Sequence, residues 1–185
     1  MGRPKKDSAA PSASEKIEAC FWQLLECEGY DKITILRLTQ ETGLNRNTIY
    51  YHYDNVEDIA RKAVEHLTDS KIVSDFISEL LSGQTELISN PQFVPRIKKI
   101  LLLAESESPF LQSFVKTTLL QTWFHCFQID TSKLSASDWM VLDFISSGMT
   151  SMLGNMALRN APETLRLFPT TELGKAALRT LQQLS

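Results

Sequence analysis

Three consecutive residues, Arg46-Asn47-Thr48, have side chains suited to reading the edges of nucleic-acid bases. In the major groove of DNA, arginine pairs with guanine, asparagine pairs with adenine, and threonine bonds either base. The next aromatic residues, Tyr50-Tyr51-His52, add two hydroxyls and a ring nitrogen that can reach phosphate groups. This run therefore predicts a surface that contacts double-stranded DNA.

A second candidate for chemistry is the pair His125-Cys126, which lies among Trp123, Phe124 and Phe127. Histidine and cysteine can bind zinc or act as a nucleophile with its base, but zinc needs three or four protein ligands. No second ligand cluster and no serine or carboxylate motif accompanies the pair. We therefore expect no catalytic residue, no metal site, no cofactor and no enzymatic activity, and interpret this segment as a helix that lines a core or an apolar cavity.

The DNA-reading run requires a short helix held at a fixed angle to another helix, and the surrounding sequence predicts this arrangement over about residues 34–53. Thr34 can cap the first of the two helices, and Asn45 can cap the second. Gly43 lies at the turn, where the chain reverses and glycine is favoured. Leu38 and Ile49 can pack together between the two helices. The segment has the anatomy of a helix-turn-helix.

Further helices are predicted on both sides of this motif. Ser12 and Glu15 form a capping-box pattern for a first helix, and Gly29 is placed to end it in the left-handed conformation. Asn55 can cap a fourth helix. The remaining apolar patterns predict helices at about 71–82, 91–105, 109–128, 137–158 and 171–184.

These elements predict an all-α fold with a three-helix head, which carries the helix-turn-helix, joined to a helical-bundle body. We divide the chain into a disordered basic arm at 1–11, a DNA-binding domain at 12–70, and a ligand-binding and dimerisation domain at 71–185.

The head resembles the tetracycline-repressor (TetR) family. The resemblance covers about residues 12–67 and depends on Gly29-Tyr30, Ile33-Thr34-Ile35, the run from Thr42 to Tyr53, and Asn55. It implies an all-helical homodimer whose heads bind a palindromic operator and whose bodies bind a small-molecule effector. Carried over by position, the operator contacts would be Thr34, Arg46, Asn47, Thr48, Tyr50, Tyr51 and His52.

Two positions depart from the family pattern. Val56 stands where members commonly have a phosphate-binding lysine, and Leu36 stands where some have a base-reading arginine. The basic arm can compensate, because an arginine on a flexible arm can enter the minor groove. We therefore add Arg3, Lys5 and Lys6 to the expected DNA contacts.

We expect the aromatic and methionine residues of the body to lie mainly in its core. Such residues also line pockets for apolar ligands. Trp123, Phe127 and Met149 are our candidates for contact with an effector, which we expect to be apolar or weakly polar.

The predicted helix at 137–158 is apolar around much of its circumference and must be covered on more than one side. It also carries small residues that allow close helix approach. Together with 171–184, it predicts a symmetric four-helix interface of a homodimer.

Bulk composition agrees with a globular protein of 185 residues. The net charge of −3 limits DNA contact to local basic groups. The odd cysteine count, the absence of a secretory signal and the absence of a long apolar run predict a cytoplasmic protein without a membrane partner.

These observations favour a ligand-responsive, sequence-specific DNA-binding regulator. It would repress transcription until a small-molecule effector releases it from its operator. The alternative is an adaptor or coactivator of the same fold that binds a protein instead of an operator, an alternative raised by Val56 and the acidic balance.

Overall fold

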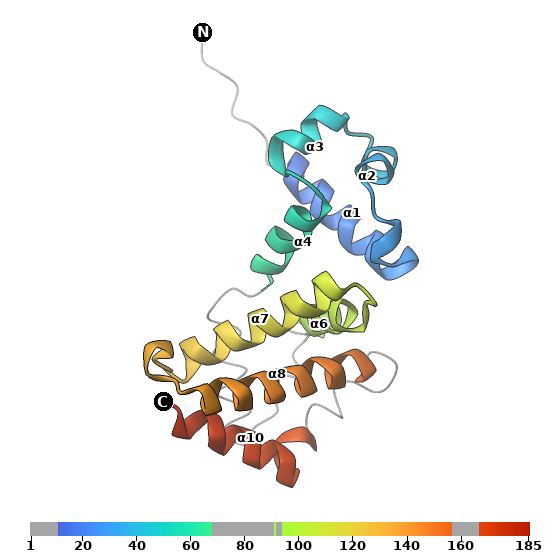
Figure 1. Cartoon of the computed structure of the whole chain (residues 1–185). Helices are drawn as coiled ribbons and strands as arrows, with labels where there is room; N and C mark the ends of the chain where they lie inside the picture. The colour runs from blue at the N-terminus through green and yellow to red at the C-terminus, as the bar shows by residue number, and fades with distance from the viewer. Residues whose placement is uncertain (1–10, 68–90, 92–93, 157–166) are drawn as a thin grey trace. The chain divides into compact units, whose positions relative to one another are not determined.

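The structure is a computed structural model that describes residues 11–67, 91, 94–156 and 167–185. Within these ranges all regular elements are α-helices or short 3₁₀ turns, with no strand (Figure 1). The predicted all-α class is thus confirmed. The chain divides into two compact units, Met1–Val64 and Glu65–Ser185, which we call the head and the body.

The first helix of the head, α1, spans Ala13–Glu28. Its N-terminus has the predicted capping box: the Glu15 amide donates to the Ser12 hydroxyl, and the Ser12 amide donates to the Glu15 carboxylate at 2.7 Å. Gly29 ends the helix with a φ of 83°, but its ψ of 164° is extended and not the left-handed helical value that we predicted. The chain therefore leaves α1 in an extended direction and enters the 3₁₀ turn η1, Tyr30–Lys32.

The predicted helix-turn-helix is present as α2, Ile35–Thr42, and α3, Arg46–His52. The Thr34 hydroxyl accepts from the amide at the third position of α2, and the Asn45 side chain accepts from the Asn47 amide at 2.6 Å. Gly43 lies between the helices with a φ of 67° and a ψ of 8°, the left-handed conformation that glycine adopts without strain. Leu38 and Ile49 are fully buried, as the pattern predicted.

The fourth helix of the head, α4, spans Val56–Glu65. The Asn55 side chain caps it by accepting from the Asp58 amide at 2.8 Å. Four apolar side chains on one face of α4 are buried, namely Ile59, Ala60, Ala63 and Val64.

The described part of the body contains four α-helices: α6 at Val94–Glu105, α7 at Pro109–Cys126, α8 at Ala136–Met156 and α10 at Glu172–Gln183. Helix α8 packs against both α6 and α7, and α10 packs against the 3₁₀ turn η4, Phe168–Thr170 (Figure 1). Between α7 and α8 lies the turn η3, Thr131–Lys133.

The predicted boundaries of the body helices are close to the observed ones. Ser108 caps α7, and Pro109 occupies its first turn. Helix α7 ends at Cys126, two residues before the predicted end, and Gln128 has a φ of 54° that breaks the helix there. The predicted helix at 71–82 and the basic arm lie outside the described residues. No helix in the described part of the chain is long and apolar enough to cross a membrane.

Candidate nucleic-acid interface

The outward side of α3 presents the polar and aromatic side chains that the sequence predicted. Asn47 is exposed beside Arg46 at the start of the helix, and Tyr51 is 84% exposed near its end. Thr48 and His52 are half-buried at the border of this surface. Ile49 faces inward, so the helix is amphipathic over only seven residues. Such a short helix with a polar outer side has the dimensions required to enter a major groove.

Arg46 and Tyr50 are paired on this surface. The Arg46 Nη2 atom donates to the Tyr50 hydroxyl at 3.1 Å, and the guanidinium carbon lies 5.4 Å from the centre of the tyrosine ring. Both contacts leave other guanidinium N–H groups available to a base or phosphate, since arginine has five donors. The two side chains thus hold each other in place on the outer side of α3.

Tyr51 and His52 form a second aromatic pair, with ring centres 5.1 Å apart and planes 87° apart. The edge-to-face geometry is one that aromatic rings favour. It holds the half-buried imidazole beside the exposed phenol at the end of α3.

Two residues at the beginning of α2 border the same helix-turn-helix. Thr34 is exposed, and its hydroxyl, which accepts from the Arg37 amide at 3.1 Å, still has a proton to donate to a phosphate. Leu36 is 66% exposed. Its side chain has no hydrogen-bonding group.

Arg37 was not singled out from the sequence, and the structure engages it in ion pairs within the head. Its guanidinium forms ion pairs with Glu28 and Glu41, each at 2.7 Å. The hydrogen bond with Arg37 lowers the pKa of Glu28, and the same bond raises the pKa of Arg37. This arginine therefore joins α1 to α2 and is engaged by carboxylates.

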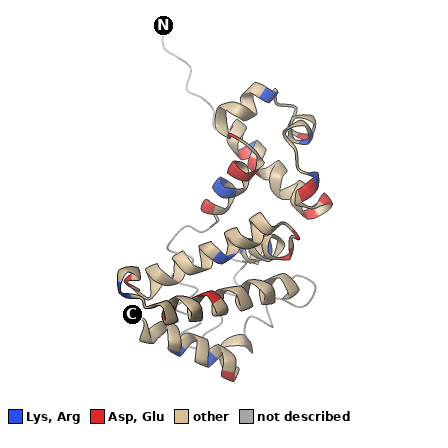
Figure 2. Cartoon of the chain, viewed as in Figure 1, with Lys and Arg blue, Asp and Glu red and all other residues tan. Residues whose placement is uncertain are grey.

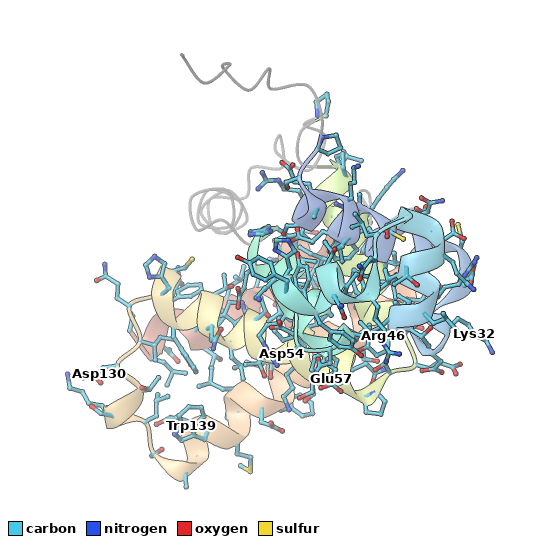
Figure 3. All side chains as sticks on the ribbon, turned by 90° about the horizontal axis from the view of Figure 1, so that it is seen from above. Lys32, Arg46, Asp54, Glu57, Asp130 and Trp139 are labelled. Carbon is cyan, nitrogen blue, oxygen red and sulfur yellow. The ribbon has the colours of Figure 1, made fainter. Side chains whose placement is uncertain are left out.

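The helical region that carries α1 to α4 is poor in positive charge. Residues 12–67 contain ten Asp or Glu and six Lys or Arg. Arg46 is the one Lys or Arg of α3, and Figure 2 shows little blue on this helix. Figure 3 labels Asp54 and Glu57, which follow α3 in the chain. Both acidic residues are exposed. The predicted arm contacts, Arg3, Lys5 and Lys6, lie outside the described residues.

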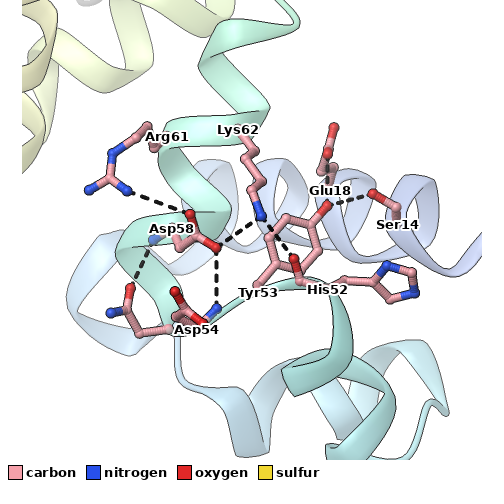
Figure 4. Close-up of polar contacts among 9 residues, drawn as sticks. Ser14, Glu18, His52, Tyr53, Asp54, Asp58, Arg61 and Lys62 are labelled. Carbon is pink, nitrogen blue, oxygen red and sulfur yellow. Dashed lines mark hydrogen bonds and ion pairs between the residues drawn. The ribbon is translucent and has the colours of Figure 1, made fainter.

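A polar network joins the C-terminal end of α3 to α1 and α4 (Figure 4). Tyr53 is buried, and its hydroxyl donates to Glu18 at 2.8 Å and pairs with Ser14 at 2.7 Å. Lys62 of α4 donates to the backbone carbonyl of His52 at 2.9 Å. Lys62 was not singled out from the sequence.

In the body, the three candidate effector residues gather in one hydrophobic cluster. Trp123 and Phe127 are buried in it together with Leu142 and Leu181, and Met149 packs against it partly buried. His125 is exposed, outside this cluster. The described residues hold no group of three or more His, Cys, Asp or Glu that could bind a metal ion.

Comparison with curated proteins finds a match to a regulator of Staphylococcus epidermidis, the biofilm operon icaADBC HTH-type negative transcriptional regulator IcaR. The two sequences are 41% identical over 39 residues. The chain is similar to a helix-turn-helix regulator of the TetR family. The matched segment is 21% of this chain and 21% of the relative, so the similarity concerns about a fifth of either protein.

Two other comparisons add nothing to this match. No protein-family model matches the chain. No solved structure matches it either.

Proposed function

We propose that this TetR-like chain is a sequence-specific DNA-binding transcriptional regulator, acting as a repressor that a small-molecule effector releases from a palindromic operator. The observation that carries the proposal is the helix-turn-helix itself: a capped, seven-residue α3 whose outer side presents base-reading side chains and whose inner side is buried. The similarity to a regulator described as negative supports both DNA binding and repression.

Each predicted contact has a distinct role in this proposal. Arg46, Asn47 and Thr48 at the start of α3 bond base edges, where they supply sequence preference. Phosphate contacts position the head and come from the remaining residues, Thr34, Tyr50, Tyr51 and His52. The arm residues Arg3, Lys5 and Lys6 enter the minor groove and supply much of the charge that the head lacks.

A homodimer would place two heads on the operator. The exposed apolar residues of the body support such a dimer. Helix α8 exposes Trp139, Met140 and Phe144, the last at 75%, and α10 exposes Leu173 at 70%. Ser147 and Gly148 continue the exposed side of α8 with small side chains. Large apolar side chains exposed along one helix mark an interaction surface. We propose that α8 and α10 pair with their copies in a second chain.

Effector binding is the finer part of the proposal and depends on the cluster around Trp123, Phe127 and Met149. A methionine half-buried beside two aromatic rings can move to admit an apolar ligand. Such a ligand weakens operator binding by thermodynamic linkage. The effect is only as large as the difference between its affinities for the two states of the dimer, one with a head spacing that fits the operator and one without.

The adaptor function remains the second candidate because residues 12–67 carry more acidic than basic side chains and Val56 replaces the expected lysine. Fluorescence anisotropy with the promoter fragment beside the gene, against a shuffled fragment of equal length, separates the two. Salt-sensitive nanomolar binding to the promoter alone supports the regulator. Equal binding to both fragments would reject it and favour the adaptor.

A further inference from the structure

The ammonium group of Lys62 is held by three partners on two sides of the turn between α3 and α4 (Figure 4). Its Nζ atom donates to the His52 carbonyl at 2.9 Å and pairs with the Asp58 carboxylate at 3.1 Å. It also lies 4.9 Å from the centre of the Tyr53 ring. We call Lys62, Asp58 and Tyr53 the α3 clasp.

The carbonyl that Lys62 binds belongs to the last residue of the recognition helix. Carbonyls in the last turn of a helix lack intrahelical partners and carry a partial negative charge. A hydrogen bond from an ammonium group is among the stronger ones that such a carbonyl can accept. Lys62 therefore fixes the C-terminal end of α3 to α4.

Helix α3 depends on such external fixation. It has only seven residues, and isolated helices of this length are not stable in water. Asn45 caps its start, while its C-terminal end has no glycine cap and continues into Tyr53 in an extended conformation. The orientation of α3 is thus set by the contacts at this end.

The clasp also reaches α1. The Tyr53 ring lies near Lys62, while its hydroxyl contacts Glu18 and Ser14 on α1. On the other side, the Asp58 carboxylate accepts from the Asp54 amide at 3.2 Å, which holds the turn before α4. Polar contacts from α1 and α4 therefore reach the last residue of α3, His52, and the residue after it, Tyr53.

We propose that Lys62 is a positioning residue for DNA recognition: it holds α3 at the angle at which Arg46 to His52 fit the groove, without contacting DNA itself. This inference rests on the proposed DNA-binding function. Its basis is that the ammonium group is committed to a carbonyl, a carboxylate and an aromatic ring, which leaves it little capacity for a phosphate.

Arg61, the preceding residue, provides a matched control. It carries the same charge on the same helix, and its ion pair with Asp58 is longer, at 3.5 Å. None of its contacts in the described structure reaches α3. Replacing Arg61 by methionine removes one positive charge from α4, as Lys62→Met does, but leaves the clasp bond to the His52 carbonyl.

The test measures three variants, Lys62→Met, Arg61→Met and Lys62→Arg, by anisotropy with a duplex that the wild-type protein selects from a random library. Circular dichroism and urea unfolding establish that each variant is folded under the binding conditions. Hydrogen exchange of the Tyr53 amide, which donates to the Ile49 carbonyl, reports the order of α3 without DNA. If Lys62→Met does not fold, Lys62→Gln takes its place.

We expect Lys62→Met to bind the selected duplex about tenfold more weakly, the size of one lost charge-assisted hydrogen bond. The slope of log affinity against log salt should stay at the wild-type value, because no phosphate contact is lost. Exchange at Tyr53 should become faster. Arg61→Met should change neither exchange nor affinity beyond about twofold, and Lys62→Arg should restore most of the affinity.

Three results would overturn the inference while leaving the proposed function intact. One is wild-type affinity in folded Lys62→Met, which would make Lys62 only a stabilising residue. Another is a salt slope lowered by about one, which would make it a phosphate contact. The third is an equal loss in both methionine variants. If the wild-type protein selects no duplex above random DNA, the proposed function fails, and the role of Lys62 in recognition fails with it.

Discussion

Arg46 lies across the ring of Tyr50, one helical turn further along α3, and donates to its hydroxyl at 3.1 Å. Both side chains are exposed, so the pair is ordered without being buried. A long side chain that is already held in place loses less rotamer freedom on binding. We therefore expect Arg46 to contribute more to DNA binding than the other side chains of α3.

Arg46→Ala should therefore weaken binding to the selected duplex by about 1–3 kcal/mol and relax its sequence preference at one position of each half-site. Arg37→Ala is the matched control, because it removes an arginine that is tied to Glu28 and Glu41. Arg37→Ala should mainly lower the free energy of unfolding and have little effect on the sequence preference of DNA binding. Binding assays on single-base variants of the duplex distinguish the two. A uniform loss over all sequences would show that Arg46 contacts a phosphate and not a base.

The stability of the head should fall at alkaline pH through Tyr53. Burial, supported by the adjacent Glu18 carboxylate, raises the pKa of Tyr53 to about 12. The same phenol ionises near pH 10 in the unfolded chain. Its contribution to stability is thus complete below about pH 10 and is lost as the pH rises towards 12.

Tyr53→Phe tests this contribution, since it keeps the ring and removes the ionisable hydroxyl. Urea unfolding at pH 9 and pH 11 should show a smaller loss of stability in the variant than in the wild-type protein. Tyr51→Phe, at an 84% exposed position, serves as the control and should behave as the wild-type protein does. An identical pH dependence in Tyr53→Phe and the wild-type protein would contradict the assignment.

Two glycines of α8 should respond differently to alanine. A Cβ atom at Gly154 would lie 2.6 Å from the carbonyl oxygen of Ala104 on α6, whereas one at Gly148 would meet nothing within 4 Å. Gly154→Ala should lower stability by about 1–3 kcal/mol through the forced separation of the two helices. Gly148→Ala should lower stability less than Gly154→Ala does, because a Cβ atom at Gly148 meets nothing within its own chain. Thermal unfolding that ranks the two in the opposite order would contradict the observed packing.

Phe144→Asp should convert the proposed dimer into a monomer. The side chain is 75% exposed on α8 within the proposed interface, where a carboxylate would be buried against apolar side chains of the partner. Leu36→Asp places the same charge on a 66% exposed apolar residue of the head and should leave the dimer intact. Analytical ultracentrifugation gives the mass directly. A wild-type monomer at micromolar concentration, or a dimeric Phe144→Asp, would reject the proposed interface.

Local features of the fold could be predicted from the sequence because they depend on residues a few positions apart. The caps at Ser12, Thr34 and Asn45 and the turn at Gly43 are hydrogen bonds or dihedral angles within one short segment. The burial of Leu38 and Ile49 follows from periodicity. The conformation of Gly29 was predicted only in the sign of φ, because its ψ is set by the path to η1.

Contacts between helices could not be predicted in the same way. Arg37 meets Glu28, and Lys62 meets the His52 carbonyl, only after α1, α2, α3 and α4 have packed. The spacing of Asp58 and Lys62 indicates a helical ion pair but contains no information about the end of α3. Likewise, periodicity shows that α8 is widely apolar, whereas only the structure shows that Trp139 and Phe144 are on its exposed side.

The most direct test of the central claim is the ratio of affinities of the wild-type protein for its selected duplex and for a shuffled duplex of the same composition. We predict a ratio of at least about 10³ at physiological salt, the lower range for specific regulators, with affinity that falls steeply as salt rises. A ratio near one would contradict the claim that α3 reads DNA.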